Sequence, residues 1–145
     1  NSFLFNVGYT AYSGFDSLTY YDTPTNDKMF IAQSAAIREL ASGGGCVIIG
    51  RCADYVLRDE PKLVRVFIRA DKEDRVKRAI EDYDLPVKRA EAQIKRIDKS
   101  RANYYRYYTN RVWGSPENAD LIINSSFTGV DGAVAIIKTM LAERG

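Results

Sequence analysis

Residues Gly43 to Leu57 read G-G-G-C-V-I-I-G-R-C-A-D-Y-V-L. Within this stretch, Cys46 to Ile49 form an apolar run rich in β-branched residues, which is typical of a strand buried on both faces of a parallel sheet. Gly50 ends the run, and ligands of such sheets bind just beyond the carboxyl ends of the strands. Arg51 follows at that point, and its planar fork of donors suits a phosphate or a carboxylate. We therefore predict that Arg51 binds a ligand, and a surface ion pair with Asp54 is the alternative.

On either side of this stretch, helical and strand-like segments alternate along the chain. Such alternation predicts an α/β fold with a parallel sheet and flanking helices. The predicted helices are Asn26–Ala41, a single turn at Asp54–Leu57, Lys72–Tyr83, Val87 to Tyr104 with an extension toward Tyr108, and Val130–Glu143. The predicted strands are Cys46–Ile49, Leu63–Ala70 and Ala119–Asn124. In the last helix, Val134, Ile137 and Leu141 have the spacing of an inner stripe.

Size and composition indicate an ordinary globular protein. The 145 residues are enough for one domain with its own core, so we predict a single domain over residues 1–145. The chain has no histidine, which excludes His-based acid–base catalysis and His metal sites, and we predict no metal ligands. Cys46 and Cys52 fit reduced thiols better than a disulfide. No apolar run approaches the roughly 20 residues of a membrane span. We therefore expect a cytoplasmic protein without a membrane partner.

The first part of the chain, Asn1 to Pro24, is rich in aromatic and small polar residues and shows no sustained periodicity. We predict an irregular segment anchored by its aromatic side chains, with a short helix near Asn1 to Tyr9. Packing on its own domain is the favoured interpretation. An arm that binds a partner, from Asn1 to Gly14, is the alternative.

A basic and tyrosine-rich segment runs from Lys95 to Arg111 and reads K-R-I-D-K-S-R-A-N-Y-Y-R-Y-Y-T-N-R. On a helix, Asp98 and Arg101 are three positions apart and share a face. Three explanations are open: a lid that clamps phosphate groups over a nucleotide, a nucleic-acid surface, or a helix that packs through its tyrosines with its charges in water. We favour the lid and expect a small-molecule nucleotide, not a nucleic acid, as the partner.

Six motifs, taken in order, resemble the cytidylate-kinase-like family of bacterial relatives of nucleoside monophosphate kinases. They are N-D-K-M-F-I-A-Q-S (Asn26–Ser34), G-R-C-A-D-Y-V-L (Gly50–Leu57), R-V-F-I-R-A (Arg65–Ala70), D-K-S-R-A-N-Y-Y (Asp98–Tyr105), Y-T-N-R-V-W-G (Tyr108–Gly114) and A-D-L-I-I-N-S-S (Ala119–Ser126). The resemblance covers nearly all residues from about Asn26 onward, and the motifs are more specific together than alone.

The resemblance implies a P-loop kinase fold, an α/β parallel sheet with flanking helices, and transfer of the ATP γ-phosphoryl group to a CMP-like acceptor. Arg51 corresponds to the family's acceptor-binding arginine. Asp98 and Arg101 correspond to the D-x-x-R of the lid helix, which we place at residues 86–111. The predicted catalytic residues are Arg101, Arg96 and Arg106. The predicted substrate-binding residues are Arg51, Asp54, Asp98, Lys99, Tyr104 and Tyr105.

Two departures from the family pattern qualify this expectation. True cytidylate kinases carry an Asp directly after the strand-end arginine, whereas this chain has Cys52, so cytosine specificity does not carry over. The phosphate-binding motif G-x-x-x-x-G-K-[ST] does not occur in the sequence. In the family, that loop and the first two strands precede the residues matched here.

We therefore expect roughly 45–60 residues, including the first strands of the sheet, to precede Asn1 in the natural protein. The cofactors implied by the resemblance, ATP and Mg²⁺, would be bound mainly by that part. The 145 residues alone are expected to be inactive as a kinase. A non-catalytic protein that binds a nucleotide or a partner on the same fold is the alternative function, and a homo-oligomer is left open.

Overall fold

The computed structural model describes residues 23–83 and 85–144. The chain divides into two compact units, Asn1–Ile48 and Ile49–Gly145, which are described here one at a time. The irregular segment predicted from Asn1 to Pro24 lies outside the described residues except for Thr23 and Pro24, which are helical, so the prediction is wrong at these two positions. The short helix predicted near Asn1 to Tyr9 and the alternative of a partner-binding arm also lie outside the described residues. The single domain predicted over residues 1–145 stays a prediction.

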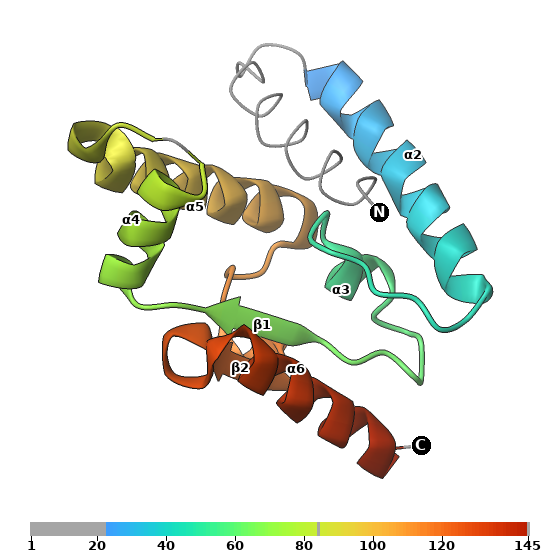
Figure 1. The fold of residues 1–145 in the computed structure, drawn as a ribbon. Coiled ribbons are helices and arrows are strands. Elements are labelled where there is room, and N and C mark those ends of the chain that lie inside the picture. The colour runs from blue at the N-terminus through green and yellow to red at the C-terminus, as the bar shows by residue number, and fades with distance from the viewer. Residues whose placement is uncertain (1–22, 84, 145) are drawn as a thin grey trace. The chain divides into compact units, whose positions relative to one another are not determined.

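The described part of the first unit is dominated by one helix, α2, at Thr23–Ser42 (Figure 1). The predicted helix is therefore confirmed, and it begins three residues earlier than expected. Ser34 and Ile37 are its buried side chains, whereas Ile31 and Leu40 are exposed. The helix ends where Gly44 and its successor take positive φ angles, which glycine adopts without a steric cost.

The strand predicted at Cys46–Ile49 is wrong. These residues form no strand, and the side chains of Val47 and Ile49 are 91% and 87% exposed. A strand exists only when its backbone groups pair with a neighbour. Among the described residues the only paired strands are two later ones, so this apolar run has no sheet to enter. High β-propensity alone did not make it a strand.

The second unit contains the remaining elements, which alternate between helix and strand. They are α3 at Ala53–Val56, β1 at Val66–Arg69, α4 at Lys72–Glu81, α5 at Val87–Thr109, the short 3₁₀ helix η2 at Pro116–Asn118, β2 at Leu121–Asn124 and α6 at Ser125–Arg144. Each helix and strand predicted after residue 50 is confirmed in type. The fold is a mixed α/β fold, mostly helical, with a small parallel sheet.

The sheet consists of β1 and β2, which pair in parallel with Val66 opposite Leu121. The register is held at its start by Arg65, whose side chain donates to both carboxylate oxygens of Asp120 at 3.1 and 2.6 Å. At the far end, the Ser125 hydroxyl donates to the carbonyl of Arg69 at 3.1 Å. Hydrogen bonds at both ends of the two strands therefore stabilise a single register.

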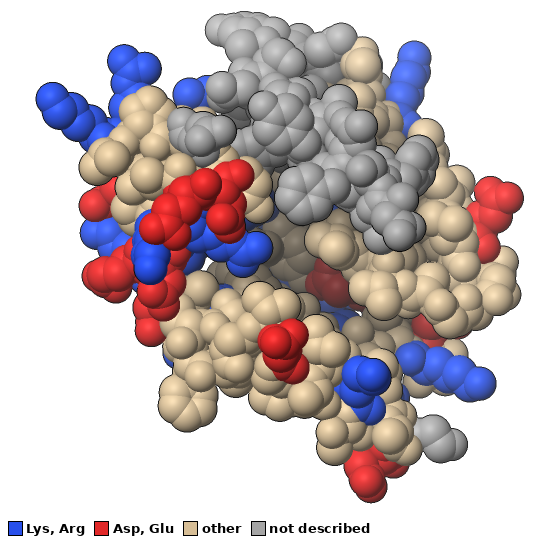
Figure 2. All heavy atoms as spheres, viewed as in Figure 1, with Lys and Arg blue, Asp and Glu red and all other residues tan. Residues whose placement is uncertain are grey.

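Helices α4 and α5 pack against each other, and α6 packs against both strands (Figure 1). In α4, Ala79 is buried and Val76 and Ile80 are half-buried, as their spacing predicts. In Figure 2, basic and acidic side chains interleave over the α4–α5 region, and the face around α6 carries few charges.

The inner stripe predicted for the last helix is wrong at two of its three residues. Val134 and Leu141 are exposed, while Ala133 is buried and Ile137 and Met140 are half-buried. The helix begins at Ser125 and is interrupted at Gly129, which has a φ of 67° and a ψ of 179°. The apolar spacing of the sequence does not reveal the interruption at Gly129. It therefore does not determine which face of the rest of α6 packs against the sheet.

Candidate functional site

The loop that follows the exposed apolar run has an unusual backbone. Gly50, Arg51 and Cys52 have φ angles of 70°, 56° and 55°, which puts three consecutive residues in the left-handed region. Residues with a Cβ rarely adopt this conformation, and each one costs on the order of 1–3 kcal/mol. The turn is closed by the amide of Ala53, which donates to the carbonyl of Gly50 at 3.0 Å. Such strain concentrates at functional sites.

The last residue of the loop and the helical turn that follows it are packed in the interior of the second unit. Cys52, Ala53, Val56 and Leu57 are all buried, and Cys52 is only 4% exposed. Burial, followed by the nearby negative charge of Asp54, raises the pKa of the Cys52 thiol to about 12. The thiol is therefore neutral at physiological pH, and it is neither a ready nucleophile nor a metal ligand. Apolar burial of this short segment offsets the cost of the loop.

One hydrogen bond connects this segment to α5. The hydroxyl of Tyr105 donates to Oδ2 of Asp54 at 2.6 Å, although the two residues are 51 positions apart. Tyr105 is 7% exposed, and burial is the main reason that its pKa lies above the usual value, with the bond to Asp54 adding to the shift. The hydroxyl therefore stays protonated and remains the donor at neutral pH.

Arg51 lies close to the same end of α5. Burial, followed by the Cys52 thiol, raises the pKa of Tyr104 to about 12, and the positive charge of Arg51 opposes that shift. The Tyr104 ring also makes an edge contact with Tyr108, at a centroid distance of 4.8 Å. The structure thus brings together four predicted site residues: Arg51, Asp54, Tyr104 and Tyr105.

Two further guanidinium groups lie beside this cluster. Arg58 and Arg111 lie over the ring of Tyr55, with centroid distances of 4.5 and 5.2 Å. Arg111 follows Asn110, a left-handed residue that ends α5. Arg58, Arg111 and Tyr55 are not among the site residues predicted from the sequence. The excess of positive charge makes this region attractive to an anion.

A second cluster lies about two turns earlier on α5. Nη2 of Arg75 contacts both carboxylate oxygens of Asp98, at 2.9 and 2.7 Å, and Nη1 of Arg101 is 3.6 Å from Oδ1. The expectation that Asp98 and Arg101 share a face is therefore confirmed. Asp98 and Tyr105 are seven positions apart and also share a face, separated by roughly 10 Å along the axis.

Sequence reasoning missed Arg75, which comes from α4. The helical spacing could have identified it. Arg75 is four positions before the buried Ala79 and therefore lies on the inward side of the helix. An arginine on that side needs a carboxylate partner. The other predicted residues of α5, namely Arg96, Lys99 and Arg106, are exposed on its surface.

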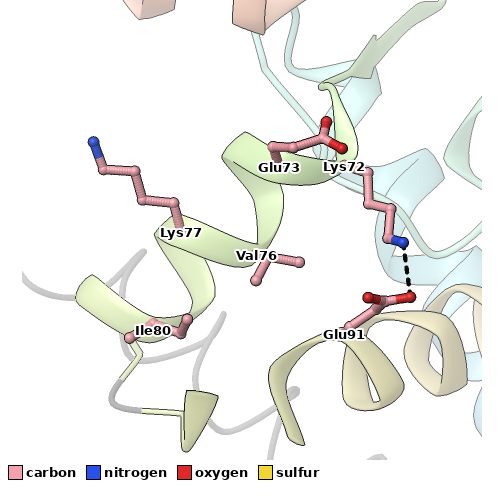
Figure 3. Close-up of a pocket in the computed structure, with 6 residues that line it drawn as sticks. All are labelled: Lys72, Glu73, Val76, Lys77, Ile80 and Glu91. Atoms are coloured by element: carbon pink, nitrogen blue, oxygen red, sulfur yellow. Dashed lines mark ion pairs between the residues drawn. The ribbon is translucent and has the colours of Figure 1, made fainter. Parts of the chain in front are cut away.

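A separate groove of about 470 Å³ lies along α4 and the start of α5 (Figure 3). It is lined by Lys72, Glu73, Val76, Lys77, Ile80 and Glu91, none of which was predicted as a site residue. Nζ of Lys72 is 2.7 Å from Oε1 of Glu91, and this bond, with a second from Lys95, lowers the pKa of Glu91 to about 2. Since these charges already neutralise one another, the Arg51 loop is the better candidate for anion binding.

The described residues contain no group of three His, Cys, Asp or Glu side chains that could hold a metal ion. Among the helices in the described ranges, none is long and apolar enough to span a bilayer.

Comparisons with known proteins point to one family. A model of the cytidylate kinase-like family matches residues 1–127. Among solved structures, the chain is similar to the crystal structure of an uncharacterized protein from Eubacterium ventriosum ATCC 27560. The two are 30% identical with a TM-score of 0.76, and the match covers 90% of this chain and 70% of that one. The comparison with curated proteins found no match.

Proposed function

The chain belongs to the cytidylate kinase-like family, and from this membership we propose that it binds a nucleoside monophosphate as the phosphate acceptor of a nucleotide kinase. The observation that carries the proposal is the position of Arg51. It sits on a strained, well-anchored loop, and its charge acts on Tyr104 of the basic helix α5. A guanidinium held in this way provides directed donors for a phosphate dianion.

The proposed reaction is transfer of the γ-phosphoryl group of ATP to a CMP-like acceptor. Arg51 holds the acceptor phosphate, with Asp54, Tyr104 and Tyr105 around it and Asp98 and Lys99 further along α5. Arg101, Arg96 and Arg106 supply the positive charge that stabilises the transferring group, since such catalysis is mostly positioning and electrostatics.

The residues that the structure describes do not fit Mg²⁺ and the ATP phosphates. The sequence contains no G-x-x-x-x-G-K-[ST] segment, and the described residues hold no carboxylate cluster of metal-binding type. We therefore assign the predicted site residues to the acceptor and to the charge on the transferring group, and not to the binding of Mg²⁺ or of the other ATP phosphates. We expect the 145 residues by themselves to bind an acceptor without turning it over.

Recognition of the acceptor is proposed to depend more on its phosphate than on its base. Cys52 stands where true cytidylate kinases have an Asp, and it is buried with a neutral thiol. A side chain in that state offers only a weak donor to a base. We therefore expect CMP and UMP to bind with affinities within about tenfold of each other.

Isothermal titration calorimetry with CMP, UMP, AMP and cytidine tests the proposal. Wild-type protein is expected to bind the monophosphates and not cytidine. Arg51→Ala is expected to weaken CMP binding by about 10–100-fold, the worth of a charge-assisted hydrogen bond. Arg51→Lys keeps the charge but loses the fork, and we expect an intermediate loss. The exposed Lys62 gives the control, because Lys62→Ala removes one positive charge outside the site. Equal affinity in wild type and Arg51→Ala would refute the proposal.

A non-catalytic binding protein is the second candidate. The buried Cys52 and the missing phosphate-binding motif favour it. Affinity for CMP in a natural full-length protein that shows no ADP release with ATP, Mg²⁺ and any monophosphate would decide for this candidate.

A further inference from the structure

The left-handed conformation of the Gly50–Cys52 loop needs support from outside the loop. Arg51 and Cys52 both carry a Cβ and both have positive φ. Such a conformation persists only where the surrounding structure over-determines it. Burial of Cys52 fixes one end of the loop, but burial alone does not specify the direction in which its neighbour Arg51 projects.

The hydrogen bond between Asp54 and Tyr105 can determine the direction in which Arg51 projects. Asp54 lies in the first turn of α3, two residues after the loop, and Tyr105 lies near the end of α5. The bond is short, part-buried and charge-assisted, which places it among the strong hydrogen bonds of proteins. The neighbouring Tyr104 senses the charge of Arg51, so the same turn of α5 is next to the loop.

We propose that Asp54 and Tyr105 are positioning residues, whose hydrogen bond holds the Gly50–Cys52 loop against α5 and thereby fixes the guanidinium of Arg51 for anion binding. The identity of that anion rests on the proposed function. The link between the loop and α5 does not, so the two can be tested separately.

Cys52 provides a reporter that needs no ligand. Its thiol is buried at the end of the loop, whereas Cys46 is exposed. In native protein treated with 5,5′-dithiobis(2-nitrobenzoic acid), Cys46 should react at once, and Cys52 should react only when its segment opens. The fast phase from Cys46 is thus an internal reference for protein concentration and reagent activity.

Tyr105→Phe removes the hydroxyl and keeps the ring. We expect Cys52 to react about tenfold faster in this variant, the effect of losing one strong hydrogen bond. The rate should not depend on urea below the unfolding transition, because a local opening exposes little surface. Tyr107→Phe removes a hydroxyl from an exposed ring of the same helix and should leave the rate at the wild-type value.

Variants of Asp54 separate the hydrogen bond from the charge. Asp54→Asn keeps an acceptor oxygen and should react within about threefold of wild type, while Asp54→Ala should match Tyr105→Phe. An unchanged Cys52 rate in Tyr105→Phe would overturn the proposal. A faster rate that rises steeply with urea would also overturn it, because that result signals loss of global stability.

Calorimetry with CMP then tests the consequence for Arg51. Tyr105→Phe is expected to raise the Kd for CMP about tenfold, and Tyr107→Phe, at an exposed ring of the same helix, should leave the Kd at the wild-type value. Faster Cys52 modification with an unchanged Kd would overturn the role assigned to the pair. If wild-type protein does not bind CMP, the proposed function fails, and the thiol rates still decide whether the pair holds the loop.

Discussion

Arg51 and Cys52 are neighbours with opposite environments. Cys52 is turned into the protein and has a neutral thiol, while Arg51 remains half-buried, close enough to α5 to affect Tyr104. The left-handed backbone of Gly50, Arg51 and Cys52 lies between these two environments. A strained backbone therefore separates the residue that anchors the loop from the residue that we propose to bind the ligand.

Replacement of Gly50 by alanine should destabilise the protein by about 1 kcal/mol, because a Cβ disfavours its positive φ. A Cβ at Gly50 would meet nothing within 4 Å, so the loss would come from the backbone alone. Urea denaturation measures the change. Gly43→Ala is the matched control, since Gly43 is not left-handed and its Cβ would only touch the carbonyl oxygen of Leu40 at 3.5 Å. Equal effects of the two substitutions would contradict this account of the loop.

The buried Cys52 thiol should make stability fall in alkaline solution. Its pKa is about 12 in the folded protein and about 9 when exposed, so the unfolded chain loses this proton first as the pH rises. The folded state then binds more protons than the unfolded state, and the free energy of unfolding falls as pH rises above 9, by at most about 1.4 kcal/mol per pH unit. Below pH 9 the full stability is present. Urea titrations from pH 8 to 10.5 should show a steeper decline in wild type than in Cys52→Ala, and parallel declines would refute this.

At the scale of elements, α5 is the organising part of the proposed site. One face carries Asp98, Arg101 and Tyr105, and that face meets α4 through Arg75 and the segment after the loop through Asp54. A helix attached at both places can align charges along its length. The basic residues predicted for catalysis lie on this same helix.

Removal of the Asp98 carboxylate should loosen the contact between α4 and α5. Asp98→Ala leaves Arg75 without its carboxylate, and because these side chains are 24% and 37% exposed we expect a loss of about 1 kcal/mol in unfolding free energy. Asp82→Ala breaks a more exposed pair with Arg78 on α4 itself and should cost only about 0.3 kcal/mol. Thermal or urea unfolding compares the two. A larger loss in Asp82→Ala would contradict the role given to the Asp98 pair.

The helices and strands after residue 50 could be predicted because their signals are local. The apolar spacing of α4, Pro86 before α5 and the β-branched runs of β1 and β2 each lie within one segment. The contacts that build the site are not local. The Asp54–Tyr105 and Arg75–Asp98 pairs join residues 51 and 23 positions apart, and no periodicity within either segment names its partner.

For the molecule as a whole, the strand predicted at Cys46–Ile49 is wrong for the same reason, because strand formation also depends on contacts that are not local. The status of an apolar run depends on the neighbours that the fold provides, and in the described residues the sheet consists of β1 and β2 alone. The family resemblance gave the correct α/β class and the correct family. It did not give the exposure of side chains, which depends on what packs against them.

Substitution of an exposed branched residue should change the free energy of unfolding much less than substitution of a buried one. Val47→Lys should change the free energy of unfolding by less than about 0.5 kcal/mol, because the side chain is exposed. Ile123→Ala should cost about 2–4 kcal/mol, because Ile123 is 3% exposed in β2. Urea denaturation of both variants checks the comparison. A loss above 2 kcal/mol for Val47→Lys would show that the run is buried.

A crystal structure of the protein with CMP would show whether Arg51 binds the phosphate of a nucleotide beside α5. The account predicts phosphate oxygens within hydrogen-bond distance, about 2.7–2.9 Å, of the Arg51 guanidinium, with the Gly50–Cys52 loop still left-handed and Tyr105 still bonded to Asp54. CMP bound elsewhere, such as in the groove beside Lys72 and Glu91, with Arg51 away from its phosphate, would contradict the account.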